Sequence, residues 1–400
     1  MTNADILFQN ANLPAAPLSD ILVRDGVIAA ILPAGSMAAE GRPTVDIGGR
    51  LLLPGFVEGH IHLDTSFYGD VWVPHKPCTD GFDVHERVRF QAENMADAAP
   101  MIDRARNQIE LSIAQGSTRM RSHVMVDGSV GLASLETVLA VRAEYRDLID
   151  VELVAFPQSG ILRSPGTDRL LDEAISLGAD VIGGLDPASF DRDPQRHLDV
   201  VFGIAERRGV PVDIHLHDGG SLGAFTIEEI IARTEATGLQ GRVAISHAYG
   251  LGDLAPDAAR RLAARLARAG IAIMTNAPGA HAFPPVALLR AEGVTVFSGS
   301  DNIRDSWWPY GDGDMLGRAM MIGYRSGFYT DAELEAAFDV VTYGGAKALG
   351  LADYGLEAGK RADFVALAAA HVPEAVVSVP HQRAVYRAGR LVAENGKVIR

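Results

Sequence analysis

Cysteine, lysine and long apolar runs are scarce in this sequence. A single cysteine, Cys78, excludes an internal disulfide and a metal knuckle built on paired cysteines. No Lys/Arg run occurs and the formal net charge is −15 at pH 7, which disfavours binding to nucleic acid or to an anionic membrane. No apolar run approaches the roughly 20 residues that span a bilayer, and the first residues lack the basic segment of a signal peptide. We therefore expect an unprocessed cytoplasmic protein that acts on a small neutral or cationic molecule.

Short β-type segments separated by turn residues make up both ends of the sequence. Near the N-terminus they occupy residues 5–8, 21–23, 27–32 and 51–53. Near the C-terminus they occupy residues 363–366, 383–387 and 391–393. Strands this short need a partner sheet to bury an apolar face, so we predict that residues 1–54 and 351–400 form one small β-sandwich domain. Two separate terminal hairpins are the alternative.

Residues 55–350 alternate apolar β-type runs with Ala-, Leu-, Arg- and Glu-rich stretches, the α/β pattern of parallel βα units. Eight runs lie at 55–63, 118–125, 151–156, 181–185, 212–216, 243–247, 271–275 and 294–298. Helical spacing of apolar residues marks intervals such as 132–145 and 254–269. Eight units predict a closed (β/α)8 barrel, the TIM barrel. An open doubly wound sheet is the alternative, but no glycine-rich phosphate loop follows the first run.

Polar side chains stand at the C-terminal ends of the predicted strands. In a barrel these ends gather at one face, where active sites are built. Six of the twelve histidines lie at four of these ends: His60, His62, His123, His215, His217 and His247. Other ends carry Gln158, Asp186, Asn276 and Asp301. This clustering predicts a functional site at the face where the strands end.

The pair His60 and His62 points to a metal ion. Side chains two residues apart face the same way in a strand, so both imidazoles are aimed into the barrel. A borderline divalent ion needs one or two further ligands from other strands and an open position for water. His215 and Asp301 are the natural candidates.

Several segments resemble one known family. Residues 54–64 (PGFVEGHIHLD) are similar to the first-strand motif of the amidohydrolase superfamily. Residues 154–158, 246–248, 300–309 and 355–363 resemble its cytosine deaminase branch, and 215–218 (HLHD) with 300–305 (SDNIRD) are most similar to s-triazine-degrading members. The resemblance covers the chain end to end. It implies a metal-dependent hydrolase on a (β/α)8 barrel with a terminal β-sandwich.

The resemblance implies that His60, His62, His215 and Asp301 bind one divalent ion, zinc or iron. Binuclear relatives bridge two ions with a carbamylated lysine on a middle strand. The only lysines here are Lys76, Lys347, Lys360 and Lys397, none of them near a middle strand end. We therefore expect a single metal ion.

The resemblance also implies catalytic and substrate-binding roles. Gln158 would read a ring carbonyl and its adjacent N–H, and His247 would orient or activate the metal-bound water. Asp301 would take the water proton and Asp218 would protonate the ring nitrogen, although the branch carries the longer glutamate at the position of Asp218. Four further residues are expected to border the substrate: Trp307, Trp308, His123 and His217.

These features predict that a metal-bound hydroxide attacks a ring carbon and releases ammonia or an alkylamine from a carbonyl-bearing N-heterocycle. Cytosine, an ammelide-type s-triazine and a related pyrimidine or pterin are the substrates considered. One alternative is a cyclic amide hydrolase of the hydantoinase or dihydroorotase kind, which is disfavoured because the bridging lysine is missing. A second is a non-catalytic metal-binding scaffold, disfavoured because Asp218 and Asp301 are both present. Assembly through outer helices would give a homo-oligomer.

Overall fold

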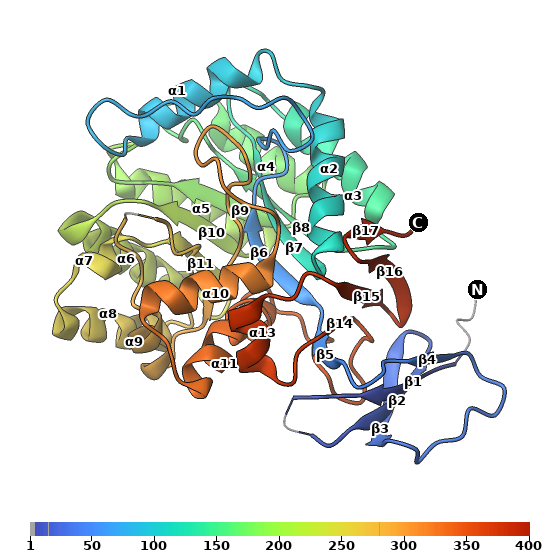
Figure 1. Ribbon diagram of the computed structural model, residues 1–400. Coiled ribbons are helices and arrows are strands. Elements are labelled where there is room, and N and C mark those ends of the chain that lie inside the picture. The colour runs from blue at the N-terminus through green and yellow to red at the C-terminus, as the bar shows by residue number, and fades with distance from the viewer. Residues whose placement is uncertain (1–4, 15, 280) are drawn as a thin grey trace.

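The computed structural model describes residues 5–14, 16–279 and 281–400. Eight parallel strands follow one another in chain order around a barrel (Figure 1). They are β6 (Phe56–Ile61), β7 (Ser117–Met125), β8 (Asp150–Phe156), β9 (Val181–Leu185), β10 (Val212–Leu216), β11 (Val243–His247), β12 (Ala272–Met274) and β13 (Val296–Phe297). Each predicted apolar run overlaps one of them. The predicted (β/α)8 architecture is confirmed.

The barrel closes between β6 and β13. The backbone N–H of Asp301 donates to the carbonyl of His60 at 2.7 Å, and that of Gly59 donates to the carbonyl of Ser298 at 3.0 Å. Gly299 permits this approach, because a Cβ there would lie 2.3 Å from the backbone N and O of His60. The first and last strands are therefore joined, which excludes the open doubly wound sheet.

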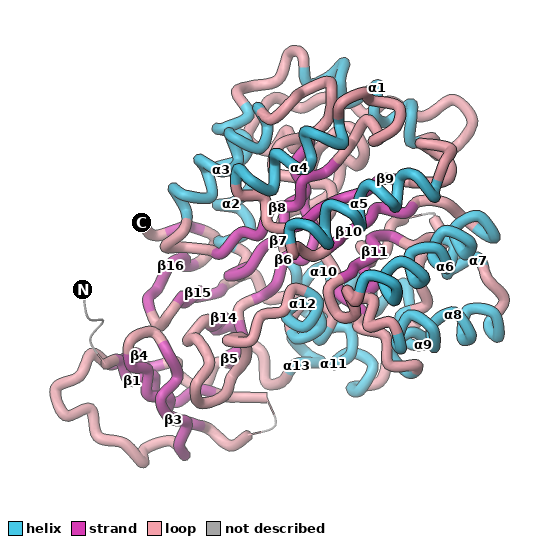
Figure 2. The backbone as a smooth tube through the Cα atoms, turned by 180° about the vertical axis from the view of Figure 1, so that it is seen from behind, coloured by secondary structure: helices cyan, strands magenta, loops and turns pink. Residues whose placement is uncertain are grey.

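Helices cover the outside of the barrel (Figure 2). They are α2 (Met101–Ala114), α3 (Ala133–Tyr145), α4 (Thr167–Leu177), α5 (Pro194–Arg208), α6 (Gly220–Thr237), α8 (Pro256–Arg268), α9 (Val286–Ala291), α10 (Met315–Ser326), α11 (Asp331–Asp339) and α12 (Tyr343–Ala348). The predicted helical intervals correspond to α3 and α8. On α8 the apolar stripe of Leu262, Ala263 and Leu266 is buried against the barrel. Among the residues described, no helix combines the length and the apolar character needed to cross a bilayer.

Two further helices lie in the loops that follow barrel strands. α1 (Val84–Met95) comes after β6, and α7 (Gly250–Asp253) comes after β11. α1 begins at Asp83, whose side chain caps the backbone N–H of Glu86, and it buries only Phe90 and Gln91. In Figures 1 and 2 it lies at the end of the barrel away from β1–β4. The helix therefore covers the barrel mouth with little anchoring of its own.

The two ends of the chain form two sheets. One has the order β3-β2-β1-β4, with β1 (Ile6–Ala11), β2 (Ser19–Arg24), β3 (Val27–Pro33) and β4 (Thr44–Asp46). The other has the order β17-β16-β15-β14-β5, with β5 (Leu51–Pro54), β14 (Phe364–Leu367), β15 (Arg383–Arg387), β16 (Arg390–Glu394) and β17 (Lys397–Val398). Phe8 of the first sheet packs edge-on against Phe364 and Tyr386 of the second, with centroids 5.5 and 5.1 Å apart.

The small terminal β domain is therefore confirmed. Because β5 pairs with β14, residues more than 300 positions apart share one sheet, which excludes two independent hairpins. The sequence did not predict α13 (Val372–Ser378), a short helix between β14 and β15. The division of the chain at residues 54 and 351 stays a prediction.

A buried ion pair joins this β domain to the barrel. Arg383 on β15 donates from its two Nη atoms to Asp314 at 2.8 and 2.7 Å, and the two side chains are 0% and 1% exposed. Asp314 also caps α10 by accepting from the backbone N–H groups of Leu316 and Gly317. A bidentate Arg–carboxylate pair fixes geometry as well as charge. The orientation of α10 is thus tied to the terminal sheet.

Candidate active site

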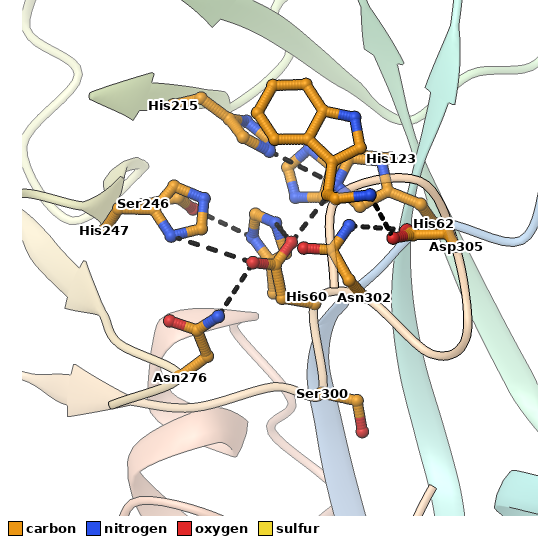
Figure 3. Close-up of polar contacts among 12 residues, drawn as sticks. His60, His62, His123, His215, Ser246, His247, Asn276, Ser300, Asn302 and Asp305 are labelled. Carbon is orange, nitrogen blue, oxygen red and sulfur yellow. Dashed lines mark hydrogen bonds and ion pairs between the residues drawn. The ribbon is translucent and has the colours of Figure 1, made fainter. Parts of the chain in front are cut away.

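The four predicted metal ligands converge at the C-terminal end of the barrel. One ligand atom from each of His60, His62, His215 and Asp301 lies within 4.8 Å of the others. Figure 3 labels the three histidines, whose rings point toward one another. Nε2 of His60 and Nε2 of His62 are each 3.4 Å from Oδ1 of Asp301, and Nε2 of His215 is 3.4 Å from Nε2 of His62. Ile61, the last residue of β6, lies between the two histidines and packs into the hydrophobic core instead. The alternation expected of a strand therefore places both imidazoles inside the barrel.

The chemistry of this cluster fits a divalent metal ion. Nε2 of His60 and Nδ1 of His215 are buried and have no hydrogen-bond partner in the described part of the chain. Burial lowers the pKa of both imidazoles, which keeps them in the neutral form that binds metal. Burial alone would raise the pKa of Asp301, but His247, His60 and His62 hold that pKa well below its ordinary value. Three imidazoles and one ionised carboxylate are a donor set for zinc or iron.

Asp213 and Ser246 lie behind the cluster. The hydroxyl of Ser246 lies 3.0 Å from Nδ1 of His60 and 2.7 Å from Oδ1 of Asp213. Asp213 also accepts from Nη1 of Arg121 at 3.0 Å, so its charge is paired. The sequence held a signal for Asp213, because it lies two residues before His215 and therefore on the same face of β10.

His123 lies deeper than predicted. Its side chain is fully buried, its ring centroid is 4.0 Å from that of His60, and it does not line the cavity described below. The physical reason is that β7 continues for two residues beyond His123, to Met125, so this imidazole projects below the barrel mouth. His60, His123 and Asp213 form a second group with ligand atoms within 4.8 Å. Because Arg121 already pairs with Asp213, the first cluster is the stronger metal site.

Backbone strain occurs where several strands end. Positive φ angles, which favour glycine, are found at five non-glycine residues at these ends: Asp186 (35°), His247 (72°), Ala248 (44°), Ala277 (48°) and Asp301 (60°). Each such residue costs on the order of 1–3 kcal/mol and persists only where the surroundings hold it. The turns at His247 and Asp301 place Nδ1 of His247 4.0 Å from Oδ2 of Asp301. The sequence gives no direct signal for these conformations.

A cavity of about 740 Å³ opens over the cluster. His62, His215 and Asp301 line it, together with five of the other predicted site residues: Gln158, His217, His247, Trp307 and Trp308. Asn276 also lines it and donates from Nδ2 to Oδ2 of Asp301 at 2.8 Å. The cavity lining therefore brings together most of the predicted site residues, whereas His60, His123 and Asp218 lie outside it.

His217 and Trp307 form part of the cavity wall. Nδ1 of His217 lies 2.8 Å from Oδ2 of Asp186, which orients the ring. The ring stacks on His247 with centroids 4.5 Å apart and faces Trp307 at 6.0 Å. Nε1 of Trp307 donates to Oε1 of Gln91 on α1 at 2.7 Å. Flat aromatic surfaces of this kind suit a flat heterocycle.

Asp305 holds the loop that carries the two tryptophans. Its Oδ1 accepts from the backbone N–H groups of Trp307 and Trp308 at 2.8 and 2.9 Å. Its Oδ2 accepts from Nδ2 of Asn302 at 2.6 Å. Burial raises the pKa of Asp305 to about 6 despite these contacts. One buried carboxyl therefore fixes both indoles relative to the cluster.

Asp218 lies just outside the cavity lining. Its side chain is largely buried, and Oδ2 has no hydrogen-bond partner among the described residues. Burial and the neighbouring Asp186 raise its pKa to about 6. A carboxyl group with this pKa keeps its proton to a higher pH than an exposed aspartate does.

Sequence reasoning missed several residues of the cavity lining. They come from loops or from the helices next to them: Phe82, Arg87, Tyr249, His281, Arg318 and Arg325. His281 is one of the loop residues, and its ring stacks on Tyr249 with centroids 5.4 Å apart. Alternation within strands says nothing about such residues, so their sequence signal is weak.

Comparison with known proteins gives likenesses over nearly the whole chain. The model of the amidohydrolase family matches residues 43–393. N-isopropylammelide isopropyl amidohydrolase of Pseudomonas sp. (strain ADP) is 30% identical over 364 residues, which are 89% of this chain and 89% of that protein.

Solved structures are similar as well. N-isopropylammelide isopropylaminohydrolase from Burkholderia multivorans ATCC 17616 superposes with a TM-score of 0.94 and 42% identity, over 99% of this chain and 100% of the other. 5-Methylcytosine deaminase from Klebsiella pneumoniae, liganded with phosphonocytosine, superposes with a TM-score of 0.86 and 28% identity, over 98% and 99%. Both likenesses extend through the barrel and the terminal sheets.

Proposed function

The chain belongs to the amidohydrolase family and is an enzyme acting on C–N bonds, and from this premise we propose that it releases ammonia or an alkylamine from a carbonyl-bearing N-heterocycle. The observation that carries the proposal is the cluster of His60, His62, His215 and Asp301 at the cavity that Gln158 and Trp307 also line. The names of the similar proteins support this substrate class, since they act on an ammelide or on 5-methylcytosine. Ammelide-type triazines, cytosines and pterins are the compounds to test.

A zinc or iron ion held by the four ligands would make water acidic enough to serve as the nucleophile near neutral pH. Asp301 is the residue that accepts a proton from this water, because it is ionised. Its Oδ2 is positioned by Nδ2 of Asn276. His247, kept neutral by burial, which lowers its pKa well below the ordinary value, stabilises the charge that develops beside Asp301.

Substrate orientation depends on the other cavity residues. The side-chain amide of Gln158 offers one donor and one acceptor, which match a ring carbonyl and its adjacent N–H. Trp307 and Trp308 bound the ring on the loop held by Asp305. His217 extends this wall next to His247. In this proposal His123 supports His60 from behind and does not touch the substrate.

Asp218 supplies the proton for the ring nitrogen. Its pKa of about 6 and its unpartnered Oδ2 suit a proton donor. As water adds to the ring carbon, the nitrogen takes this proton, and the proton held by Asp301 goes to the leaving amine. The C–N bond then breaks, and the proton released as the new carbonyl forms returns to Asp218. The reaction consumes one water and leaves both carboxyl groups as they began.

Metal analysis combined with a substrate panel tests the proposal. The purified protein is loaded separately with zinc and with iron, and release of ammonia or amine is measured on cytosine, isocytosine, ammelide, N-alkylammelides and pterins. We expect amine release from at least one of them that requires bound metal. Ring opening without amine release would favour a cyclic amide hydrolase. No turnover of any heterocycle by the metal-loaded protein would favour a scaffold and contradict the proposal.

Three further properties stay predictions: a single bound metal ion, a cytoplasmic location and a homo-oligomer. Metal stoichiometry tests the number of ions, and light scattering tests the oligomeric state.

A further inference from the structure

The charged lining of the cavity is opposite in sign to the molecule as a whole. The protein carries a formal charge of −15. Among the described residues that line the cavity, however, the only carboxylate is that of Asp301, the predicted metal ligand. Three lining residues are cationic: Arg87, Arg318 and Arg325. From the overall charge we expected a neutral or cationic ligand. A ligand inside a cavity meets the local field of the lining, which overall charge does not describe.

The three arginines differ in how their charge is balanced. Arg318 on α10 donates to the carbonyls of Asn276 and Ser300, and it faces the carboxylates of Glu58 and Asp301. Its charge is therefore compensated within the protein. This leaves Arg87 and Arg325 as the cations to explain.

Among the described residues, the hydrogen bonds of Arg87 and Arg325 all go to backbone carbonyls, and each guanidinium also lies over a ring, that of Phe90 at 5.9 Å and that of Phe283 at 4.5 Å. Arg87 on α1 donates from Nη1 to the carbonyls of Lys76 and Ser306 at 2.8 and 3.2 Å. Arg325 on α10 donates to the carbonyls of Pro278 and His281. In the part of the chain that the structure describes, neither forms an ion pair with a carboxylate. Two half-buried guanidinium groups therefore line one cavity with their charge unpaired.

A second observation points to a missing acceptor. Nε of Arg87 is buried and has no hydrogen-bond partner among the described residues. A buried donor without an acceptor is unfavourable unless a bound molecule satisfies it. His281 also senses the positive charge of this region. Burial lowers the pKa of its imidazole, and the charges of His217, Arg325 and Arg87 lower that pKa further. A bound anion would relieve both features.

A row of rings leads from the cluster of predicted metal ligands to Arg325. The ring centroids of His215 and His217 are 5.9 Å apart, those of His217 and Tyr249 are 5.7 Å apart, and Tyr249 is followed by His281 at 5.4 Å. The carbonyl of His281 accepts from Nη2 of Arg325 at 3.1 Å. A flat molecule seated at the cluster can therefore extend along one aromatic wall toward the guanidinium of Arg325.

We propose that Arg87 and Arg325 form an anion subsite that binds a carboxylate carried by the substrate heterocycle. The inference rests on the proposed function and narrows it, from N-heterocycles in general to those with a carboxylate substituent. A carboxylate matches the free donors, since Nε and Nη2 of Arg87 lie on one edge of a planar guanidinium and can engage two oxygens. The two arginines come from different elements, α1 and α10, so the anion would also bridge the helix over the barrel mouth to the barrel.

Matched pairs of ligands test the subsite by binding, independently of turnover. Dissociation constants of the metal-loaded protein are measured for pterin against pterin-6-carboxylate and for uracil against uracil-5-carboxylate. We expect the carboxylated member of at least one pair to bind about ten- to a hundredfold more tightly, as charged hydrogen bonds predict. The preference should shrink when salt is raised from about 50 mM to about 500 mM.

Variants assign the preference to these residues. Arg87→Gln should lower the carboxylate-to-neutral affinity ratio by about tenfold or more, and Arg87→Lys should restore part of it because the charge returns. Arg325→Gln gives a second test, with folding checked by circular dichroism because Arg325 also holds a loop. Arg89→Gln is the matched control: Arg89 is on the same helix and exposed, it does not line the cavity, and its variant should keep the wild-type ratio.

The outcomes separate this inference from the proposed function. Equal affinity for both members of every pair, or equal effects of Arg87→Gln and Arg89→Gln, would overturn the anion subsite while leaving amine release intact. A carboxylate preference that depends on Arg87 in a protein that hydrolyses no heterocycle would support the subsite and contradict the proposed function.

Discussion

Ser246 contacts the ring of His60 on the edge away from Asp301, with Oγ 3.0 Å from Nδ1. Because the serine hydroxyl donates to Asp213, its oxygen accepts from Nδ1–H of His60. The proton on Nδ1 leaves the lone pair on Nε2, the atom that lies 3.4 Å from Asp301. A chain of hydrogen bonds from carboxylate to hydroxyl to imidazole thus sets the histidine tautomer that can bind a metal through Nε2.

Removing this hydroxyl should weaken metal binding without unfolding the barrel. For Ser246→Ala we expect metal affinity to fall about 10- to 100-fold, as for other groups that orient a metal ligand. A competitive chelator titration measures the change. Ser298→Ala is the control, since this hydroxyl is equally buried but donates to the carbonyl of Thr275. Equal losses in the two variants would mean that the contact with His60 has no special role.

Loss of a ligand should abolish turnover while the fold persists. His215→Ala and Asp301→Asn each remove one donor from the cluster of four, so we expect background activity and less than one equivalent of tightly bound metal. Elemental analysis and circular dichroism check both points. His381→Ala, at an exposed histidine of the terminal domain, should behave like the wild type. Wild-type rates in a metal-loaded ligand variant would refute the assignment.

The acid role of Asp218 predicts a pH dependence. Burial and Asp186 raise its pKa to about 6, while His217 and a hydrogen bond from Ser189 oppose the shift. A proton donor works in its protonated form, so kcat/KM should decline as pH rises through about 6.

Variants of Asp218 check that assignment. Asp218→Asn cannot deliver a proton, and we expect its rate to fall about 10²- to 10⁴-fold and its alkaline decline to vanish. Asp218→Glu should retain activity and the decline. A full alkaline limb in Asp218→Asn would assign the titration to another group.

The buried pair between Arg383 and Asp314 should be costly to break. Arg383→Met leaves Asp314 uncompensated at the start of α10, and we expect a loss of about 3–5 kcal/mol in the free energy of unfolding. Urea denaturation measures it. Arg24→Met removes an exposed pair with Asp5 on the other terminal sheet and should cost at most about 1 kcal/mol. Similar losses would argue against a special link between the β domain and α10.

The closing seam of the barrel predicts that Gly299 tolerates no side chain. In Gly299→Ala the new Cβ would meet the backbone of His60 at 2.3 Å, so β6 and β13 must separate. We expect a loss of about 1–3 kcal/mol or more, together with weaker metal binding. Thermal unfolding with and without metal measures both. Gly317→Ala is the control. Gly317 lies within α10, and a Cβ there would be 3.7 Å from the nearest atom, which is an ordinary contact.

Strand-based reasoning predicted the parts of the site that depend on alternation and on the ends of strands. His60, His62, His215 and Asp301 were found in this way because a barrel gathers the ends of its strands at one face. His123 shows the limit of that reasoning, since its depth depends on how far β7 continues beyond it.

In the loops and the terminal sheets, too, some features could be predicted from the sequence and others could not. The joining of both ends of the chain in one β domain followed from the need of short strands for a partner, but α13, with seven residues, is too short to give a periodic pattern. Arg87 and Arg325 reach the cavity through loop and helix placements that apolar periodicity does not encode. The positive φ angles of His247 and Asp301 are likewise imposed by tertiary contacts.

The distance along the chain between His60 and Asp301 has a consequence for biosynthesis. The two flank the seam, so nearly the entire barrel must leave the ribosome before they can meet. Until then the nascent chain can offer a metal only the incomplete set of its earlier histidines. Full-affinity metal acquisition is therefore a late event in the maturation of this protein, and it reports that the last strand has docked.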